Sequence, residues 1–449
     1  PCFYLLSAEF SHFTFEKSKI EYTSIIILKK EIISMAFNPF KEKAPKLNDC
    51  FMDWQQLAPK PYDKNSVDPY TRTRIILMNG TEFNQVFFSH MFHRNCNNND
   101  LRRSLAVLRR QEQQQQKRIA ALKPKDETIL ETTIGYEQLA VDLTAQLART
   151  EPDRNLVKAL NFALLEDFDH LYRYADLLEM EQGIAAERIV GGYTEIMPGR
   201  PTISEHRYPT DEVKPHLTVG KADPVSILHA CIITAAEQQT MNYYMNVAAF
   251  QTNDLARKLY TEIGMIEEQH VTQYGSFIDT SRTWVENLLL HEYTECFLYY
   301  SMFMDETDVN VKQIWEQHLN IELAHLRTAA ELLETYDHKN WQEILGKGDF
   351  PELVKLHSNK DYIRDVLRDT VRLTAKEEDY VDISKLAEDY PYFRYQNDVN
   401  TVTRDVASHK VIRNYIDKHG RDYRFETAPH PVKELSDRTR DNTDIGRKP

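Results

Sequence analysis

One spacing recurs three times between residues 134 and 333, and it limits what this part of the chain can fold into. An acidic residue is followed thirty positions later by a second acid and, three positions after that, by a histidine. The three copies are Glu137/Asp167/His170, Glu237/Glu267/His270 and Glu292/Glu322/His325. With 69 acids and 16 histidines in 449 residues, chance would supply about 0.4 such triples. Three copies that align without a gap are therefore an internal repeat.

Each copy predicts an antiparallel helical hairpin. A turn or helix-start signal lies midway between the two acids in every copy: residues 151–153, 252–254 and 307–308. Fifteen residues of helix out and fifteen back, at about 1.5 Å each, return the chain to the height it left. Residues three apart share a helical face, so the second acid and the histidine aim at the first acid. We call these the first, second and third hairpins.

Composition favours helices and disfavours some partners. Only 13 of the 449 residues are glycine, which is low for a strand-and-turn architecture. The net charge of −14 argues against nucleic acid or an anionic membrane as a partner, and no apolar run is long enough to span a bilayer. The five cysteines form no Cys-x-x-Cys pair, which disfavours a zinc ribbon and fits a reducing cytoplasm.

The sequence predicts four segments. We expect residues 1–34, which lack the features of a signal peptide and precede Met35, to be an upstream extension of the gene model without function. Residues 35–130 are expected to form an N-terminal arm with amphipathic helices, residues 131–345 the metal-binding helical core, and residues 346–449 a helical segment with an extended tail. Because residues 428–449 are almost free of apolar side chains, we expect them to be disordered or to wrap a neighbouring subunit of a homo-oligomer.

Two helices are expected in the N-terminal segment after an extended stretch at residues 38–68. The first would start at Thr81 and carry His90 and His93, for which core or surface positions are favoured over metal binding. The second would run from Leu101 to Leu122 through a Gln-rich run and be amphipathic and largely solvated. In the C-terminal segment, helices are expected over residues 361–375 and 407–418.

The connections between hairpins differ in length. A proline-rich connection at residues 191–224 separates the first hairpin from the second and is long enough to cross the body. It carries Glu205, Arg207 and His216, and either shapes substrate access or is only a crossover. The second and third hairpins are separated by a short turn, so the chain there turns straight back.

The repeated acids and histidines suggest metal ligands. The acids of the repeat lie within apolar segments, where burial is costly unless they are paired or bound to metal. Two glutamates plus two Glu-x-x-His motifs in a four-helix core can bind two iron or manganese ions. On these residues, 137 to 325, the chain resembles the ferritin-like diiron carboxylate superfamily, which includes rubrerythrins, bacterioferritins and arylamine N-oxygenases. The resemblance covers under half of the chain.

The resemblance implies an all-α fold: a ferritin-like antiparallel helix bundle with one additional hairpin and extended N- and C-terminal arms. It implies a dinuclear iron or iron–manganese centre in which carboxylates bridge the ions and each histidine holds one. The implied activity is an oxidoreductase that uses O₂ or peroxide on a small-molecule substrate of unknown identity. An iron-handling ferroxidase or storage protein is the alternative, and a metal-free helical scaffold is the third hypothesis.

Three hairpins are one more than such a centre needs. In the superfamily the two His-bearing helices run antiparallel, which requires a long connection and favours the first hairpin paired with the second or third. Ligand chemistry instead favours the second and third hairpins, because Asp167 stands where the family has Glu. The neighbouring Glu166 is an alternative ligand.

Further residues near the repeat have two interpretations each. His318, one turn before Glu322, resembles the additional histidine of the N-oxygenases and could equally be a surface residue. Tyr244 and Tyr299 lie seven positions after the leading glutamates of the second and third hairpins, where core packing is favoured over a role at the metal. Glu295 falls outside the repeat and is expected to support a ligand or lie at the surface.

Overall fold

The computed structural model describes residues 37–402, 405–424 and 427–447, and this part of the chain is mostly helical. The extension expected at residues 1–34 lies outside the described residues. Eight long helices form four antiparallel hairpins. They are α2 (Pro69–Arg94) with α3 (Asn99–Ala120), α4 (Ile129–Thr150) with α5 (Arg154–Gln182), α7 (Pro224–Val247) with α8 (Asp254–Gly275), and α9 (Trp284–Asp305) with α10 (Val309–Asp337).

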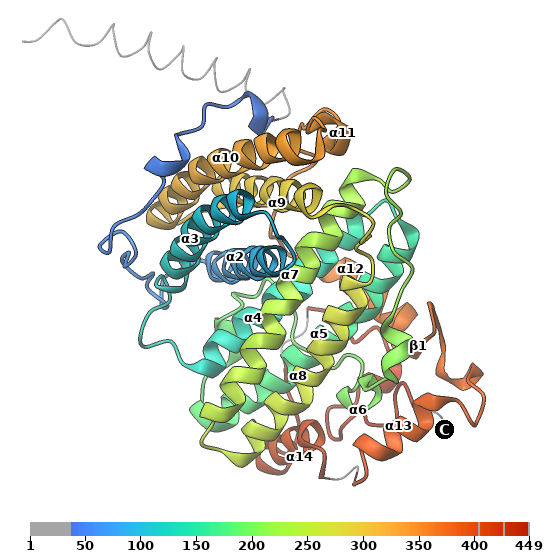
Figure 1. The fold of residues 1–449 in the computed structure, drawn as a ribbon. Helices are drawn as coiled ribbons and strands as arrows, with labels where there is room; N and C mark the ends of the chain where they lie inside the picture. Colours follow the sequence, from blue (N-terminus) through green and yellow to red (C-terminus); the bar gives the residue numbers. More distant parts are fainter. Residues whose placement is uncertain (1–36, 403–404, 425–426, 448–449) are drawn as a thin grey trace, which may run out of the picture.

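The four hairpins pair in a nested order. The two middle hairpins of the chain pack together through α4 with α7 and α5 with α8, and we call these four helices the inner set. The N-terminal hairpin, α2 with α3, packs against the third hairpin through α2 with α9 and α3 with α10, and we call these four helices the outer set. Figure 1 shows the outer set at the upper end of the molecule and the inner set below it. Helix α2 joins the sets by packing on α4 and α7.

Local signals start the helices where the repeat predicted. The returning helices α5, α8 and α10 begin after Asp153, Asn253 and Asp308, whose side chains accept hydrogen bonds from the first backbone N–H groups. Helices α4 and α9 begin with reciprocal capping boxes. The three predicted hairpins are therefore confirmed as antiparallel helix pairs.

Helix α2 starts earlier than expected. It begins at Pro69, with the Asp68 side chain accepting from the Tyr70 N–H, so an acid and a proline form the start signal. The Thr81 hydroxyl donates to the Leu77 carbonyl within the helix and caps nothing. The start predicted at Thr81 was wrong because the helix already runs through residues 70–78, all of which are buried in the core.

Glycine allows close approach between the two sets. A Cβ at Gly80 on α2 would lie 2.8 Å from the Gln239 Cβ and 3.2 Å from the Ala235 carbonyl oxygen on α7. Real Cβ atoms do not pack this closely, so α2 and α7 meet with backbone nearly against side chain. This contact fixes the spacing between the outer and inner sets.

The C-terminal segment wraps the inner set. Helix α14 (Ala407–His419) packs on α5 and α8, and α12 (Lys360–Thr370) packs on α5. The tail was expected to be disordered or to reach a neighbour, but Val432, Leu435 and Ile445 are buried in a cluster on α5 and α12 of the same chain. These few apolar side chains suffice to hold it there.

Smaller elements complete the described chain. They are α6 (Thr202–Glu205), α11 (Gln342–Leu345), α13 (Pro391–Val399), and the strands β1 (Leu373–Lys376) and β2 (Asp379–Asp382). The strands form an antiparallel pair around a turn in which Glu377 has a φ of 51°. This pair ends the helix predicted over residues 361–375 and is the one departure from an all-helical fold in the described ranges. Among those ranges, none of the helices is both long and apolar enough to cross a membrane.

Candidate metal centres

The repeat residues of the first two hairpins meet inside the inner set. We call them the inner cluster: Glu137 on α4, Asp167 and His170 on α5, Glu237 on α7, and Glu267 and His270 on α8. Each is at most 1% exposed. Their ligand atoms form two overlapping groups, each within 4.8 Å: Glu137, Asp167, His170 and Glu267, and Asp167, Glu237, Glu267 and His270. Asp167 and Glu267 belong to both groups, which is the arrangement two bridging carboxylates require.

Both histidines of the inner cluster face it with the same nitrogen. The Nδ1 atom of His170 lies 3.1 Å from Glu267 Oε1, and that of His270 lies 3.3 Å from Asp167 Oδ1. Each Nε2 atom points away and is held 2.8 Å from another carboxylate, Glu205 for His170 and Glu166 for His270. A carboxylate on the outer nitrogen fixes the ring and leaves Nδ1 free to act as a ligand.

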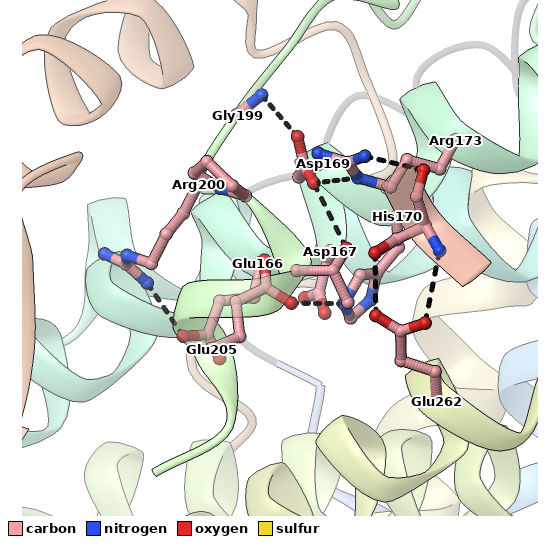
Figure 2. Close-up of polar contacts among 12 residues, drawn as sticks. Glu166, Asp167, Asp169, His170, Arg173, Gly199, Arg200, Glu205 and Glu262 are labelled. Atoms are coloured by element: carbon pink, nitrogen blue, oxygen red, sulfur yellow. Dashed lines mark hydrogen bonds and ion pairs between the residues drawn. The ribbon is translucent and has the colours of Figure 1, made fainter. Parts of the chain in front are cut away.

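The crossover between α5 and α7 supplies much of this support. Glu205 lies on α6, within the proline-rich connection. From the same connection Arg200 donates to Glu166 at 2.9 Å, and Arg207 makes a second ion pair with that carboxylate. Both guanidinium groups lie over the ring of Phe162. The surroundings of Glu166, Asp169 and Glu205 can be followed in Figure 2. Glu166, expected as an alternative ligand, thus holds His270 from outside the cluster.

Several atoms of the inner cluster have no hydrogen-bond partner. They are Glu137 Oε2, both oxygens of Asp167, both oxygens of Glu237, Glu267 Oε2 and His270 Nδ1. A buried polar atom without a partner normally costs about 1–3 kcal/mol, and more when it carries charge. So many unpartnered atoms directed at one point are compatible with a cation at that point.

Burial perturbs the carboxyl groups strongly. Desolvation raises the pKa values of Glu137 and Asp167 well above their usual range and raises that of Glu237 to about 7. Desolvation acts on Glu267 too, but the imidazoles of His170 and His270, whose Nδ1 atoms lie 3.1 and 3.3 Å from its oxygens, outweigh it and lower its pKa to about 2. Protons and cations therefore compete for the same oxygens.

A second cluster lies in the outer set. We call it the outer cluster: Glu82 on α2, Glu112 on α3, Glu292 and Glu295 on α9, and Glu322 and His325 on α10. These side chains are also at most 1% exposed. Two groups of ligand atoms lie within 4.8 Å: Glu112, Glu292, Glu322 and His325, and Glu82, Glu112 and Glu295. Glu112 belongs to both.

The outer cluster repeats details of the inner one. The Nδ1 atom of His325 faces Glu112 at 2.8 Å, and its Nε2 atom is 2.9 Å from Gln111 Oε1. Gln111 immediately precedes Glu112, just as Glu166 precedes Asp167. The tyrosines also correspond, because Tyr244 donates to Glu137 and Tyr299 donates to Glu82. Each tyrosine therefore donates to the first glutamate of the hairpin that packs against its own. The sequence had favoured core packing for both tyrosines, without this hydrogen bond.

Three members of the outer cluster, Glu82, Glu112 and Glu295, were not predicted as metal ligands from the sequence. Glu82 and Glu112 are thirty residues apart, and Gln115 follows three residues later. This is the repeat spacing with glutamine in place of histidine, so α2 and α3 form a fourth copy. A search that accepted Gln at the last position would have found it. Glu295, expected to support a ligand or lie at the surface, belongs to one of the ligand groups.

The helix α3 expected to be largely solvated buries its cluster face. Gln111, Glu112 and Gln115 are fully buried, and the Gln115 amide donates to Glu322 Oε1 at 2.6 Å and to Glu82 Oε1 at 3.2 Å. Within the Gln-rich run, Gln111 and Gln115 face the outer cluster, whereas Gln113 is exposed and Gln114 and Gln116 are half-buried, so the run is polar on both faces.

Other candidate histidines lie outside both clusters. The Nδ1 atom of His318 is 3.1 Å from the Tyr299 hydroxyl, so His318 is buried beside the outer cluster but in none of the ligand groups. The His93 ring lies against Arg102, with Nε2 3.3 Å from its Nη2. The pairing of hairpins favoured by ligand chemistry, second with third, is not observed, because only the turn at residues 276–283 separates α8 from α9.

Cavities in the molecule lie away from the clusters. One of about 650 Å³ is lined by residues including Cys231, Arg282 and Lys339. Another of about 430 Å³ is lined by residues including Phe88, Thr234 and His291. Neither is lined by a cluster residue. Because the side chains of both clusters are at most 1% exposed, they are shielded from a bulky molecule in this conformation.

The chain was compared with protein-family models, curated proteins and solved structures. No family model matches it, and neither the curated proteins nor the solved structures gave a match. The two clusters are therefore interpreted from their own geometry.

Proposed function

We propose that the inner cluster is a dinuclear iron or iron–manganese centre of the ferritin-like kind. The observation that carries this proposal is the pair of ligand groups sharing Asp167 and Glu267. These two carboxylates would bridge the ions. Glu137 and His170 would complete one position, and Glu237 and His270 the other.

The charges of the donor set fit two divalent cations. Four carboxylates and two neutral imidazoles offset a charge of about +4, so the filled cluster is close to neutral. Glu166 does not disturb this balance because it is already paired with Arg200 and Arg207. Carboxylate oxygen together with imidazole nitrogen is also a donor set that suits iron and manganese.

We further propose that the protein is an oxidoreductase that uses O₂ or peroxide. Two ferrous ions, when bound, can supply two electrons to such an oxidant. The chain's own residues would keep the site dry and ordered: Tyr244 holds Glu137, and Glu166 and Glu205 hold the two histidine rings. The closed surroundings of the cluster favour a small oxidant over a bulky one.

Metal analysis of the purified full-length chain tests the centre. We expect about two iron or manganese ions per inner cluster, and we expect His170→Ala and His270→Ala each to lower the metal content. His216→Ala is the matched control, because His216 is an exposed histidine on the same crossover. Metal content below about one ion per chain, or equal in all four proteins, would leave the metal-free scaffold as the better account.

Oxygen consumption tests the proposed reaction. The chain, stripped of metal and reloaded with ferrous iron, is expected to consume O₂ faster than the same amount of free iron. His270→Ala should abolish the difference. If the wild-type rate equals that of free iron, the centre is not an oxidase and iron handling without rapid oxidation becomes the remaining role.

A further inference from the structure

We propose that the outer cluster is a second, independent metal centre, in which one position has a histidine ligand and the other has only oxygen ligands. The first position is formed by Glu292, Glu322 and His325, the second by Glu82 and Glu295, and Glu112 is common to both. The oxygen-only position would take a hard divalent cation such as Mn²⁺. This goes beyond the proposed function, which concerns the inner cluster alone.

Unpartnered buried atoms point to a ligand at the oxygen-only position. Both oxygens of Glu295 and the Oε2 atom of Glu82 have no hydrogen-bond partner. Glu295 is 1% exposed, and one of its oxygens lies within 4.8 Å of ligand oxygens of Glu82 and Glu112. Glu295 also lies outside the repeat, so its position is not inherited from the hairpin pattern.

The charge of the outer cluster also requires a cation or protons. It contains five buried carboxylates, Glu82, Glu112, Glu292, Glu295 and Glu322. Among the ion pairs of the described ranges, these carboxylates pair only with His325, and none pairs with a lysine or an arginine. Five carboxylates with one imidazole hold too much negative charge for an apolar core unless cations or protons offset it.

The substitution of one residue in the repeat accounts for the asymmetry. Gln115 takes the position that His170, His270 and His325 occupy in the other hairpins. Its Nε2 atom donates to Glu82 Oε1 and to Glu322 Oε1, so the amide lies between the two positions. Its Oε1 atom has no hydrogen-bond partner and is an oxygen donor where histidine offers nitrogen. Oxygen ligands favour Mg²⁺, Ca²⁺ and Mn²⁺, whereas nitrogen favours iron and later transition metals.

The remaining polar residues of the outer set stabilise such a centre. Tyr299 donates to Glu82, and Gln111 holds the outer nitrogen of His325. These contacts mirror those of Tyr244 and Glu166 in the inner cluster. A scaffold that had lost its metal would have no need for a tyrosine and an amide that orient side chains toward an empty point.

Mn²⁺ binding by carboxamide variants tests the proposal. The full chain and its variants are stripped with a chelator, dialysed against Mn²⁺ and analysed for bound metal. We expect Glu295→Gln to lose about one Mn²⁺ per chain, and Glu112→Gln, which removes the ligand common to both positions, to lose about one to two. Glu316→Gln, an exposed residue of α10, should match the wild type. Full retention of Mn²⁺ by both cluster variants would overturn the proposal.

Thermal unfolding gives a second measurement that does not depend on the stoichiometry. In chelator, Glu112→Gln should melt at the same temperature as the wild type or higher, since it removes one of five crowded carboxylates. On addition of Mn²⁺ the unfolding midpoint of the wild type should rise more than that of the variant, because a ligand that binds the folded state raises the midpoint. Equal gains would argue against the centre. His270→Ala, measured in parallel, reports separately on the inner cluster.

Discussion

The carboxylate behind His170 offers a sharp test of the inner centre. Glu205 Oε2 lies 2.8 Å from the Nε2 atom of His170, and both side chains are fully buried. Glu205→Gln keeps the shape and an acceptor oxygen but removes the charge. A hydrogen bond to a charged group contributes about 1.5–3 kcal/mol and a neutral one about 0.5–1.5 kcal/mol. The difference, about 1–1.5 kcal/mol, corresponds to a roughly tenfold loss of metal affinity.

This loss should be specific to the metal. Mn²⁺ affinity is measured by competition with a chelator of known affinity, and Glu262→Gln serves as the control. Glu262 is a half-buried carboxylate of α8 that accepts hydrogen bonds from the Ser408 N–H and hydroxyl and belongs to neither cluster. We expect the control to differ from the wild type less than twofold. An affinity change below about twofold in Glu205→Gln, or an equal loss in the control, would refute the role of Glu205.

Three further predictions concern stability, measured by chemical or thermal unfolding in the presence of chelator. Glu166→Gln should destabilise the protein by about 3–5 kcal/mol, because it removes the carboxylate paired with buried Arg200, while Arg207 keeps its ion pair with Glu212; a loss below about 1 kcal/mol would contradict the ion pairs. Burial raises the pKa of Asp142 from its usual 3.8 to about 7, so its relative stabilisation is complete below pH 3.8 and is lost as pH rises through about 7. Between those pH values the free energy of unfolding of Asp142→Asn should therefore rise by up to roughly 4 kcal/mol relative to that of the wild type. If the difference between the two proteins does not change with pH, Asp142 does not titrate there. Gly80→Ala should cost about 1–3 kcal/mol through overpacking against Gln239, less about 1 kcal/mol gained in helix propensity; a more stable variant would mean that the two helix sets can move apart.

The sequence predicted the three hairpins because their signal is local. The caps at Asp153, Asn253 and Asp308 and the repeat spacing act within each hairpin, and both survive in the structure. The pairing of hairpins is not local. Connection length favoured the first hairpin paired with the second or the third, and the structure pairs it with the second. The similarity of Glu267 and Glu322 favoured the second hairpin paired with the third, which the clusters do not show. The ligand residues of a hairpin indicate what it can bind, whereas the length of the connection limits which hairpins can pack together.

Glu292, Glu322 and His325 of the outer cluster were predicted as ligands, but Glu82, Glu112 and Glu295 escaped prediction for a different reason. The repeat was defined with histidine as its last residue, and the copy formed by α2 and α3 has Gln115 there. The surroundings of α3 also looked solvated, since a run of glutamines facing carboxylates has the same composition as one facing water. Likewise Glu205 and Arg207 lie in a loop with no periodicity, so nothing in the sequence placed them against His170 and Glu166. Only the folded crossover brings them there.

The nested order of the hairpins has a consequence for synthesis on the ribosome. Helices α2 and α3 emerge early, but their partners α9 and α10 follow only after residues 121–283. At about 5–20 residues per second, the N-terminal hairpin would wait roughly 8–30 s with its carboxylate-bearing face uncovered. The inner set has no such delay and can form while the outer set is still incomplete. The outer set then forms against an inner set that already exists, so α9 and α10 complete a cluster whose first residues were translated with α2 and α3.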